Sequence, residues 1–565
     1  MRYLIIILMT TILLSSCGKK EQTHSGNYSK AENEFVEFVK ALETKAIPIY
    51  KESNLAYWNA SLTGKKEDFE KNAELMNKYD AIFADKASFE KIKKFKESGE
   101  IKDEILKREV VVLYNLFQQK QADTSKLNAI NGMQNMIEQK YGNFRTEVGG
   151  QKLTDNQVEE KLTKSTDSKE LKEVWLSQKK IGNVVADDVK KIVKMRNDLA
   201  KSMGFNNFHE MMLKVNEEDP EEISKLFDEL DALTKDAFAK EKENIDNYFA
   251  ERYKIKKEEL MPWHYQNRFF QEAPKIYKVD FDKFYEGKKL EDITTKFYKS
   301  IGLPIEDMVK NSDLYEKPGK NQHAYCTDID RSGDVRVLCN IVPNEKWMNT
   351  MLHEYGHAVY SKNIDKTLPF YLRSEAQTFC TEAIAMIMGR FSTSGPWLKD
   401  NLGISDEESK KVAEDGFKSL RLQQLVFSRW SQVMYRFEKS MYANPDQDLN
   451  KLWWDLVEKY QLLKKPEGRN EPDWATKIHI ASFPCYYHNY LMGELLASQL
   501  YFYITKNVMK SEDYKNFNFT GKPEVGKYFT EKVFNPGLKY FWNDMIEKAT
   551  GEKLTAKYYA QQFVK

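Results

Sequence analysis

The chain has 565 residues, of which 41% are hydrophobic, 31% charged and 13% aromatic. This length is too great for one small core, and the apolar content excludes an intrinsically disordered protein. Lys and Arg (87) nearly balance Asp and Glu (86), so there is no basic excess for nucleic acid, and no nucleic-acid partner is expected.

The N-terminus has the pattern of an export signal. Arg2 precedes an apolar run over residues 3–14, which ends in Leu-Ser-Ser-Cys17. The run is too short to span a bilayer, so residues 1–16 are predicted to be a signal peptide. The ending resembles the bacterial lipoprotein signal, which implies that Cys17 carries a lipid and that residues 17–28 form a tether. The protein is then exported and lipid-anchored to a bacterial membrane, at its periplasmic or cell-surface face. An ordinary signal peptide with an incidental Cys is the alternative.

From residue 29 onward, apolar residues recur mostly at helical spacing. In the segment 219–238, Asp219 is predicted to cap a helix that starts at Pro220. The residues expected on its apolar face are Ile223, Leu226, Phe227, Leu230 and Leu233. No internal repeat or Pro/Ser-rich linker interrupts the chain, so residues 29–565 are predicted to form one mainly α-helical domain, with two lobes around a deep central cleft.

Two later segments depart from plain helical patterning. The aromatic stretch 261–274 contains His264 and could line a cleft or simply pack as a loop, so it receives no catalytic role. The stretch 323–343 combines β-branched alternation with the turn signal RSGD, which predicts a short antiparallel hairpin. This hairpin lies directly before the most informative motif of the chain.

That motif is NTMLHEYGHAVY, residues 349–360. His353 and His357 are four residues apart, so a helix presents both imidazoles on one face to a single ion. Glu354 can reach a water on that ion and take its proton as the water attacks a carbonyl. The motif therefore predicts a Zn²⁺ site with its catalytic base, and a pair of satisfied core histidines is the alternative.

Catalytic zinc takes three protein ligands and a water, so a third ligand is expected downstream. Glu382 lies 25 residues after His357 in a strongly helical stretch, and its spacing favours it. Glu375 lies seven residues earlier on nearly the same face and remains the alternative.

A third group of polar residues lies in the segment 477–501. Tyr486 and Tyr490 are four apart and can project together from one helix end, where a Tyr hydroxyl or a His N–H could stabilise an oxyanion. Lys477 offers a charge for a substrate carboxylate. Aromatic stripes are usually core, so packing is an equal alternative here.

Four cysteines follow Cys17, and none forms a C-x-x-C pair that would indicate a zinc knuckle or a redox site. They are favoured as buried small hydrophobic residues, although a disulfide is possible in an exported protein. These residues are Cys326, Cys339, Cys380 and Cys485.

Together these segments resemble the M2 metallopeptidases, the angiotensin-converting-enzyme family of zinc peptidyl-dipeptidases within the gluzincin clan. That family has a substrate-binding His-Ala on a strand before the zinc helix, which His323 and Ala324 match, thirty residues ahead of His353. Its zinc-binding Glu stands in an E-A-I context, which TEAIAM matches. The resemblance thus implies Glu382, rather than Glu375, as the third ligand.

The family's downstream K-x-H pattern is matched by KIH and the following Tyr486. The resemblance implies that Lys477 and Tyr486 bind the substrate's C-terminal carboxylate and that His479 contacts a carbonyl near the scissile bond. The family's transition-state Tyr falls on Asn489, one residue before Tyr490. Tyr residues four apart resemble the M3 oligopeptidases of the same clan, and Tyr490 is assigned as the oxyanion donor.

Two further departures concern the surroundings of the site. The family's chloride-binding Arg falls at about His488, which puts chloride activation in doubt. Its Asp four residues after the zinc Glu is Met386 here, so the group that orients a His ligand must come from elsewhere.

The resemblance implies a zinc peptidase that acts on oligopeptides and releases C-terminal dipeptides. An M3-like oligoendopeptidase and a non-catalytic peptide-binding lipoprotein are the alternatives. The sequence does not indicate an oligomeric state.

Overall fold

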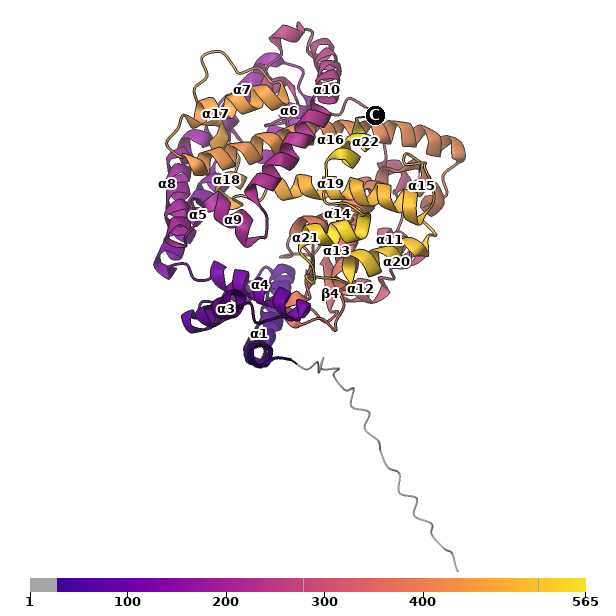
Figure 1. The fold of residues 1–565 in the computed structure, drawn as a ribbon. Helices are drawn as coiled ribbons and strands as arrows, with labels where there is room; N and C mark the ends of the chain where they lie inside the picture. The colour runs from indigo at the N-terminus through magenta and orange to yellow at the C-terminus, as the bar shows by residue number, and fades with distance from the viewer. Residues whose placement is uncertain (1–27, 278, 517, 565) are drawn as a thin grey trace, which may run out of the picture.

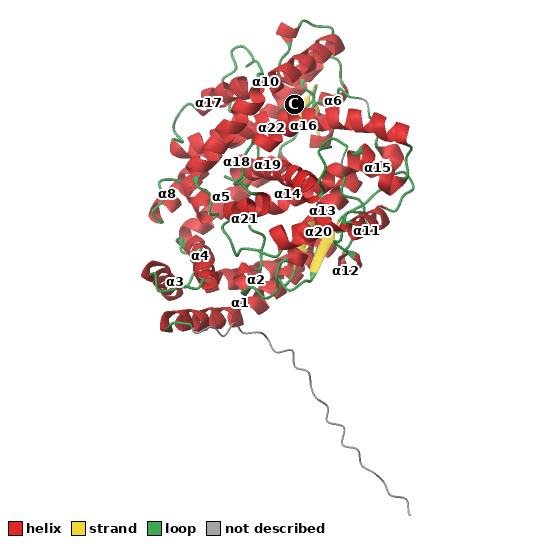
Figure 2. Ribbon diagram, turned by 45° about the vertical axis from the view of Figure 1, so that its right-hand side comes forward, coloured by secondary structure: helices red, strands yellow, loops and turns green. Residues whose placement is uncertain are grey.

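A computed structural model describes residues 28–277, 279–516 and 518–564. The predicted signal peptide, Cys17 and all of the tether except Tyr28 lie outside these residues. The described chain is mainly helical with two small antiparallel hairpins, which confirms the predicted fold class (Figure 2). Among the described helices, none is both long and apolar enough to cross a membrane.

Helices make up most of the fold in chain order (Figure 1). The first half contains α1 (Lys30–Thr63), α2 (Lys66–Phe83), α3 (Lys86–Ser98), α4 (Glu104–Gln119), α5 (Thr124–Asn143), α6 (Asp155–Lys164), α7 (Ser168–Lys179), α8 (Ile181–Ser202), α9 (Phe208–Val215), α10 (Pro220–Tyr253), α11 (Leu290–Ser300) and α12 (Glu306–Asn311). The second half contains α13 (Glu345–Asn363), α14 (Thr378–Gly389), α15 (Gly395–Leu402), α16 (Asp406–Ala443), α17 (Leu449–Leu456), α18 (His479–Ser482), α19 (His488–Tyr503), α20 (Pro523–Phe529), α21 (Trp542–Thr550) and α22 (Lys557–Phe563).

The start of α10 follows the sequence signals. The Asp219 side chain accepts hydrogen bonds from the backbone N–H groups of Glu221 and Glu222, and Pro220 is the first helical residue, as predicted. Four of the five expected apolar residues are buried, but Leu233 is 39% exposed. Thr234 occupies the inward position instead and bonds back to the Leu230 carbonyl.

The predicted hairpin is present as β3 (Tyr325–Asp328) and β4 (Val335–Leu338), with Cys326 opposite Val337. It lies against α13. A second hairpin, β1 (Thr146–Val148) with β2 (Gln151–Leu153), was not predicted. Gly149 and Gly150 connect its strands with φ of 56° and 79°, so the Gly-Gly pair was the available signal.

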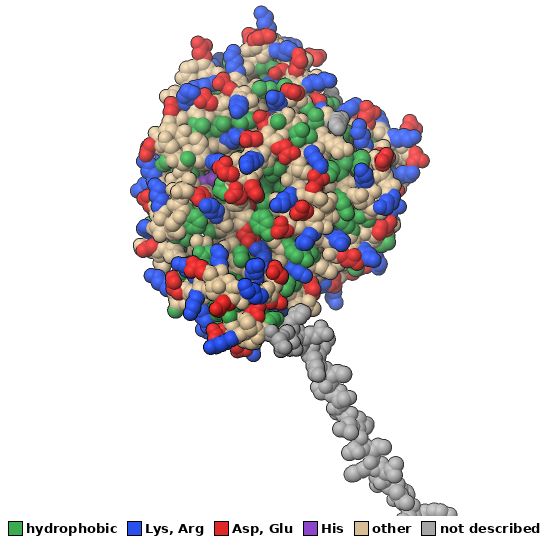
Figure 3. Space-filling view, viewed as in Figure 1, with side chains coloured by type: hydrophobic (Ala, Val, Ile, Leu, Met, Phe, Trp, Pro, Cys, Tyr) green, Lys and Arg blue, Asp and Glu red, His purple; other side chains and the backbone are tan. Residues whose placement is uncertain are grey.

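The N-terminal helices have a hydrophobic cluster of their own. Residues of α1, α3 and α4 pack together with Phe370 and Tyr371, separately from the large core that extends through the other helices. Figure 1 shows these indigo helices at the edge of the molecule where the grey trace begins. On the face in Figure 3, Lys and Arg side chains alternate with Asp and Glu, without a large area of one sign.

Helices α13, α14 and α19 pack unusually closely at two glycines. A Cβ on Gly356 in α13 would lie 2.7 Å from the Ala385 Cα in α14, closer than side-chain atoms approach backbone. A Cβ on Gly493 in α19 would lie 3.2 Å from the Glu382 Cβ. The two glycines therefore set the separations between the three helices.

We expect Gly356→Ala to destabilise the protein by roughly 1–3 kcal/mol, because backbone on α14 must move. Gly132→Ala in α5 is the matched control. A Cβ there meets nothing within 4 Å, so the change is expected to stabilise the helix by roughly 0.5–1 kcal/mol. Thermal unfolding of both variants checks the pair. A Gly356→Ala protein as stable as wild type would contradict the close packing.

Candidate active site

Helix α13 presents the H-E-x-x-H residues to a cavity. Asn344 caps the helix by accepting from the Trp347 N–H, and the apolar residues around the motif are fully buried, as predicted. These are Met348, Met351, Leu352, Tyr355, Ala358 and Val359. His353 and His357 are only half-buried, so one strip of the helix faces open space.

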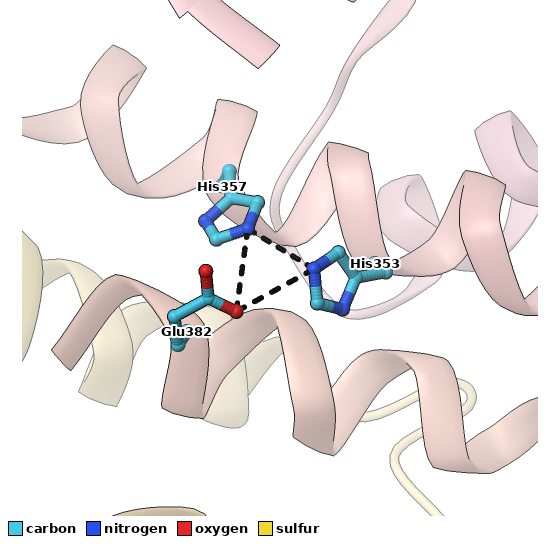
Figure 4. A group of neighbouring side chains, drawn as sticks. All are labelled: His353, His357 and Glu382. Carbon is cyan, nitrogen blue, oxygen red and sulfur yellow. Dashed lines mark hydrogen bonds and ion pairs between the residues drawn. The ribbon is translucent and has the colours of Figure 1, made fainter. Parts of the chain in front are cut away.

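His353, His357 and Glu382 converge on one point (Figure 4). The two histidine Nε2 atoms are 3.2 Å apart, and Glu382 Oε2 lies 3.7 Å from His353 Nε2 and 3.9 Å from His357 Nε2. All three ligand atoms lie within 4.8 Å of one another. Glu375 lies before α14, where it accepts a hydrogen bond from the Ser361 hydroxyl, so the structure places Glu382 rather than Glu375 in this group.

The charges of this group fit a bound cation. Burial lowers the pKa of His353 to about 3, with the neighbouring His357 contributing, and burial lowers the pKa of His357 to about 4. Both imidazoles are therefore neutral and keep a lone pair for a metal. Burial, with Glu494 contributing, raises the pKa of Glu382 to about 7, because no cation offsets its charge. Two imidazoles and a carboxylate are a known donor set for a divalent metal.

Glu354 lies beside the group in a cavity of about 470 Å³. The cavity is also lined by Ala324, both histidines and Glu382. Burial raises the pKa of Glu354 to about 8, the Glu382 carboxylate adds to the shift, and a hydrogen bond from the Cys326 backbone opposes it. A buried carboxyl one residue from a ligand is placed to exchange a proton with a molecule in the cavity.

The hairpin brings only one of its two predicted contact residues to the cavity. Ala324, just before β3, is among the lining residues. His323 is exposed, and its backbone N–H bonds to Asn321 Oδ1 at 3.0 Å. A substrate contact by His323 therefore stays a prediction. The four cysteines are free thiols, and all except Cys326 are buried, as favoured by the sequence.

Two tyrosines face Glu382 from the start of α19. Tyr486 precedes the helix and Tyr490 lies in its first turn, with ring centroids 5.2 Å apart. Burial raises the pKa of both phenols, and the nearby Glu382 carboxylate raises each further. Asn489 is instead buried, with its amide 3.5 Å from His488 Nε2. Tyr490, rather than Asn489, is thus directed toward the possible metal site.

Buried charged groups hold the tyrosine segment from outside. Cys485 has φ of 57°, a strained value for a residue with a Cβ, and its N–H bonds to the buried Glu438 carboxylate at 2.9 Å. His488 Nε2 lies 2.6 Å from Glu218 Oε2, and Arg196 donates to the Ala481 carbonyl at 2.6 Å. These contacts fix the backbone that positions both tyrosines.

Lys477 lies in an aromatic pocket. Its Nζ is 5.2 Å from the Phe269 ring centroid and 5.4 Å from those of Trp430 and Tyr487, and it donates to Gln271 Oε1 at 2.5 Å. Burial lowers the Lys477 pKa to about 8. Sequence reasoning missed Gln271, whose only signal was its place in the aromatic stretch 261–274.

His264, in the same stretch, does not join the site. It is buried and lies 2.7 Å from the Ser168 hydroxyl, so it packs the loop. His479 begins α18, with its ring 5.4 Å from that of Tyr487. Its Nδ1 is buried without a hydrogen-bond partner among the described residues, which leaves it available to a ligand. Burial, with Lys477 contributing, lowers the His479 pKa to about 4, so the ring is neutral.

Comparisons with known proteins agree with this geometry. The sequence model of the family Peptidase_M2, described as angiotensin-converting enzyme, matches residues 29–563. The chain is 23% identical to an angiotensin-converting enzyme of Haematobia irritans exigua over 72% of each protein. It is 22% identical to the Rattus norvegicus enzyme over 68% of this chain but only 31% of that protein. It is also 27% identical to carboxypeptidase 1 of Bacillus subtilis over 49% of this chain and 57% of that protein.

The convergence at Glu382 predicts which carboxylate holds a metal. Glu382→Gln should lose metal, because a neutral amide is a much weaker ligand than a carboxylate. Glu375→Gln is the matched control and should keep it. Metal content per chain after dialysis, measured by mass spectrometry, checks both. Metal retained by Glu382→Gln and lost by Glu375→Gln would reverse the assignment.

Proposed function

Because the chain belongs to the angiotensin-converting-enzyme family of peptidases, whose model matches residues 29–563, we propose that it is a zinc-dependent enzyme that releases C-terminal dipeptides from oligopeptides. One observation carries the proposal. His353, His357 and Glu382 bring three ligand atoms within 4.8 Å of one another, with the Glu354 carboxyl in the same cavity. A peptide-binding protein without turnover has no need for that fourth group.

The three ligands would hold the zinc and leave a position open to the cavity. Bound there, zinc supplies a Lewis acid that polarises a carbonyl and makes water more acidic. Glu354 accepts the proton of the attacking water and passes it to the leaving amine. Its buried setting and raised pKa suit a group that must take up a proton and release it within one turnover.

The tyrosine wall would complete the transition state. Tyr490 donates its hydroxyl hydrogen to the developing oxyanion, and His479 contacts a carbonyl near the scissile bond through its unpartnered ring nitrogen. The hairpin at Ala324 pairs with the substrate backbone as an added strand.

The pocket around Lys477 would set the point of cleavage. Lys477, Tyr486 and Gln271 bind the substrate's C-terminal carboxylate, and the aromatic rings exclude water around the charge pair. A fixed distance from this pocket to the zinc ligands selects a dipeptide. An M3-like endopeptidase is the alternative, supported by the spacing of Tyr486 and Tyr490.

The N-terminal sequence supports a location for this activity. The Leu-Ser-Ser-Cys17 pattern after an apolar run is the basis for proposing an exported enzyme, attached to a membrane by a lipid on Cys17. Oligopeptides outside the cytoplasm would then be its substrates.

The direct test of the proposed chemistry is Glu354→Gln. We expect kcat/KM for a short peptide to fall by roughly 10²–10⁴, because the proton acceptor is lost, while zinc content is unchanged. Mass spectrometry of the products gives both the rate and the size of the released fragment. Full activity in Glu354→Gln would refute its role as base, and an active but zinc-free wild type would refute the metal site.

The Lys477 pocket predicts a pH effect that depends on the substrate terminus. The Lys477 pKa of about 8 is that of a protonated group which loses its charge as pH rises, so kcat/KM for a free-acid peptide should fall above pH 8. The same peptide with an amidated C-terminus should be cleaved poorly and without this fall. Lys477→Met should remove most of the difference between the two peptides. Equal cleavage of both by wild type would favour the endopeptidase alternative.

A further inference from the structure

His357 has a hydrogen-bond partner on the side of its ring that faces away from Glu382. Its Nδ1 lies 2.7 Å from the Thr381 hydroxyl, whereas its Nε2 faces His353 and Glu382. The ring thus lies between two consecutive residues of α14, one at each nitrogen. Sequence reasoning did not single out Thr381.

This contact bears on which ring nitrogen can bind a metal. In a neutral imidazole, one nitrogen carries hydrogen and the other carries the lone pair that binds metal. If Nδ1–H donates to Thr381 Oγ1, the lone pair lies on Nε2, directed at the point where His353 and Glu382 meet. A hydroxyl oxygen accepts this bond without adding charge to the site.

The helix packing makes Thr381 suited to this task. Gly356 lies one residue before His357 and sets the close approach of α13 to α14. The side chains of Thr381 and Glu382, about 100° apart around α14, therefore reach the ring from two directions. Met386, one turn after Glu382, lies toward α19, with its sulfur 3.3 Å from where a Gly493 Cβ would be. It is an apolar thioether and cannot replace a strong hydrogen-bond acceptor.

We propose that Thr381 is the positioning residue of the metal site, holding the His357 ring in the orientation and tautomer that present Nε2 to the metal. This inference rests on the proposed zinc site. Thr381 touches neither substrate nor the reacting atoms and acts only through His357. The same helix then supplies the third ligand and the group that orients the second.

The test is the zinc affinity of Thr381→Val, measured by competition with a chromophoric chelator. Val keeps the branched shape and removes the hydroxyl, so we expect zinc to bind roughly 10–100-fold more weakly. Thr381→Ser, which restores the hydroxyl, should bind within about threefold of wild type. With zinc in excess, kcat of Thr381→Val should recover toward wild type, since the reacting groups are intact.

The outcomes separate this inference from the proposed function. A wild-type protein that binds no zinc removes the proposed site altogether. Zinc-binding wild type with equal affinity in Thr381→Val overturns the role of Thr381 alone. Weakened binding in Ser as well as Val also overturns it, because the hydroxyl would not be what matters. Thermal unfolding of the metal-free variants, with Thr381→Ala as a second hydroxyl-free protein, shows whether a loss reflects the fold instead.

Discussion

The close contact between α13 and α14 is the constraint on which the rest of the site depends. The two histidines lie on one helix and the third carboxylate on the other, so the distance between the helices decides whether one ion can reach all three. Gly356 permits that distance, since a Cβ there would lie 2.7 Å from the Ala385 Cα. Gly493 does the same for α19, which carries Tyr490. A three-helix stack with two missing side chains thereby gathers groups separated by more than a hundred residues.

Electrostatics explains why such a stack is suited to a cation. Burial keeps both imidazoles neutral and raises the pKa values of Glu354 and Glu382, so the site carries carboxyl groups with no compensating charge of their own. Desolvation of this kind costs stability unless a partner enters. The stack therefore favours a bound divalent ion and keeps a proton acceptor next to it.

The opposite wall follows a different strategy. The segment carrying His479, Tyr486 and Tyr490 has little regular structure, and its backbone is held by groups from other helices. Glu438 binds the strained Cys485 peptide, Glu218 binds His488, and Arg196 binds the Ala481 carbonyl. Strained backbone survives where surrounding contacts over-determine it. The buried charges behind this wall thus serve the position of the tyrosines.

Local sequence by itself determined the helical class, the hairpin before α13, the cap of α10 and the pairing of His353 with His357, because each depends on spacing along one element. The family resemblance added Glu382. Local patterns could not exclude Glu375, predict the exposure of Leu233 or find Gln271 and Thr381. Those features depend on which helices touch and at what separation. Only the tertiary structure decided them, because a contact between α13 and α14, or between Lys477 and Gln271, joins elements whose relation is set by packing rather than by periodicity.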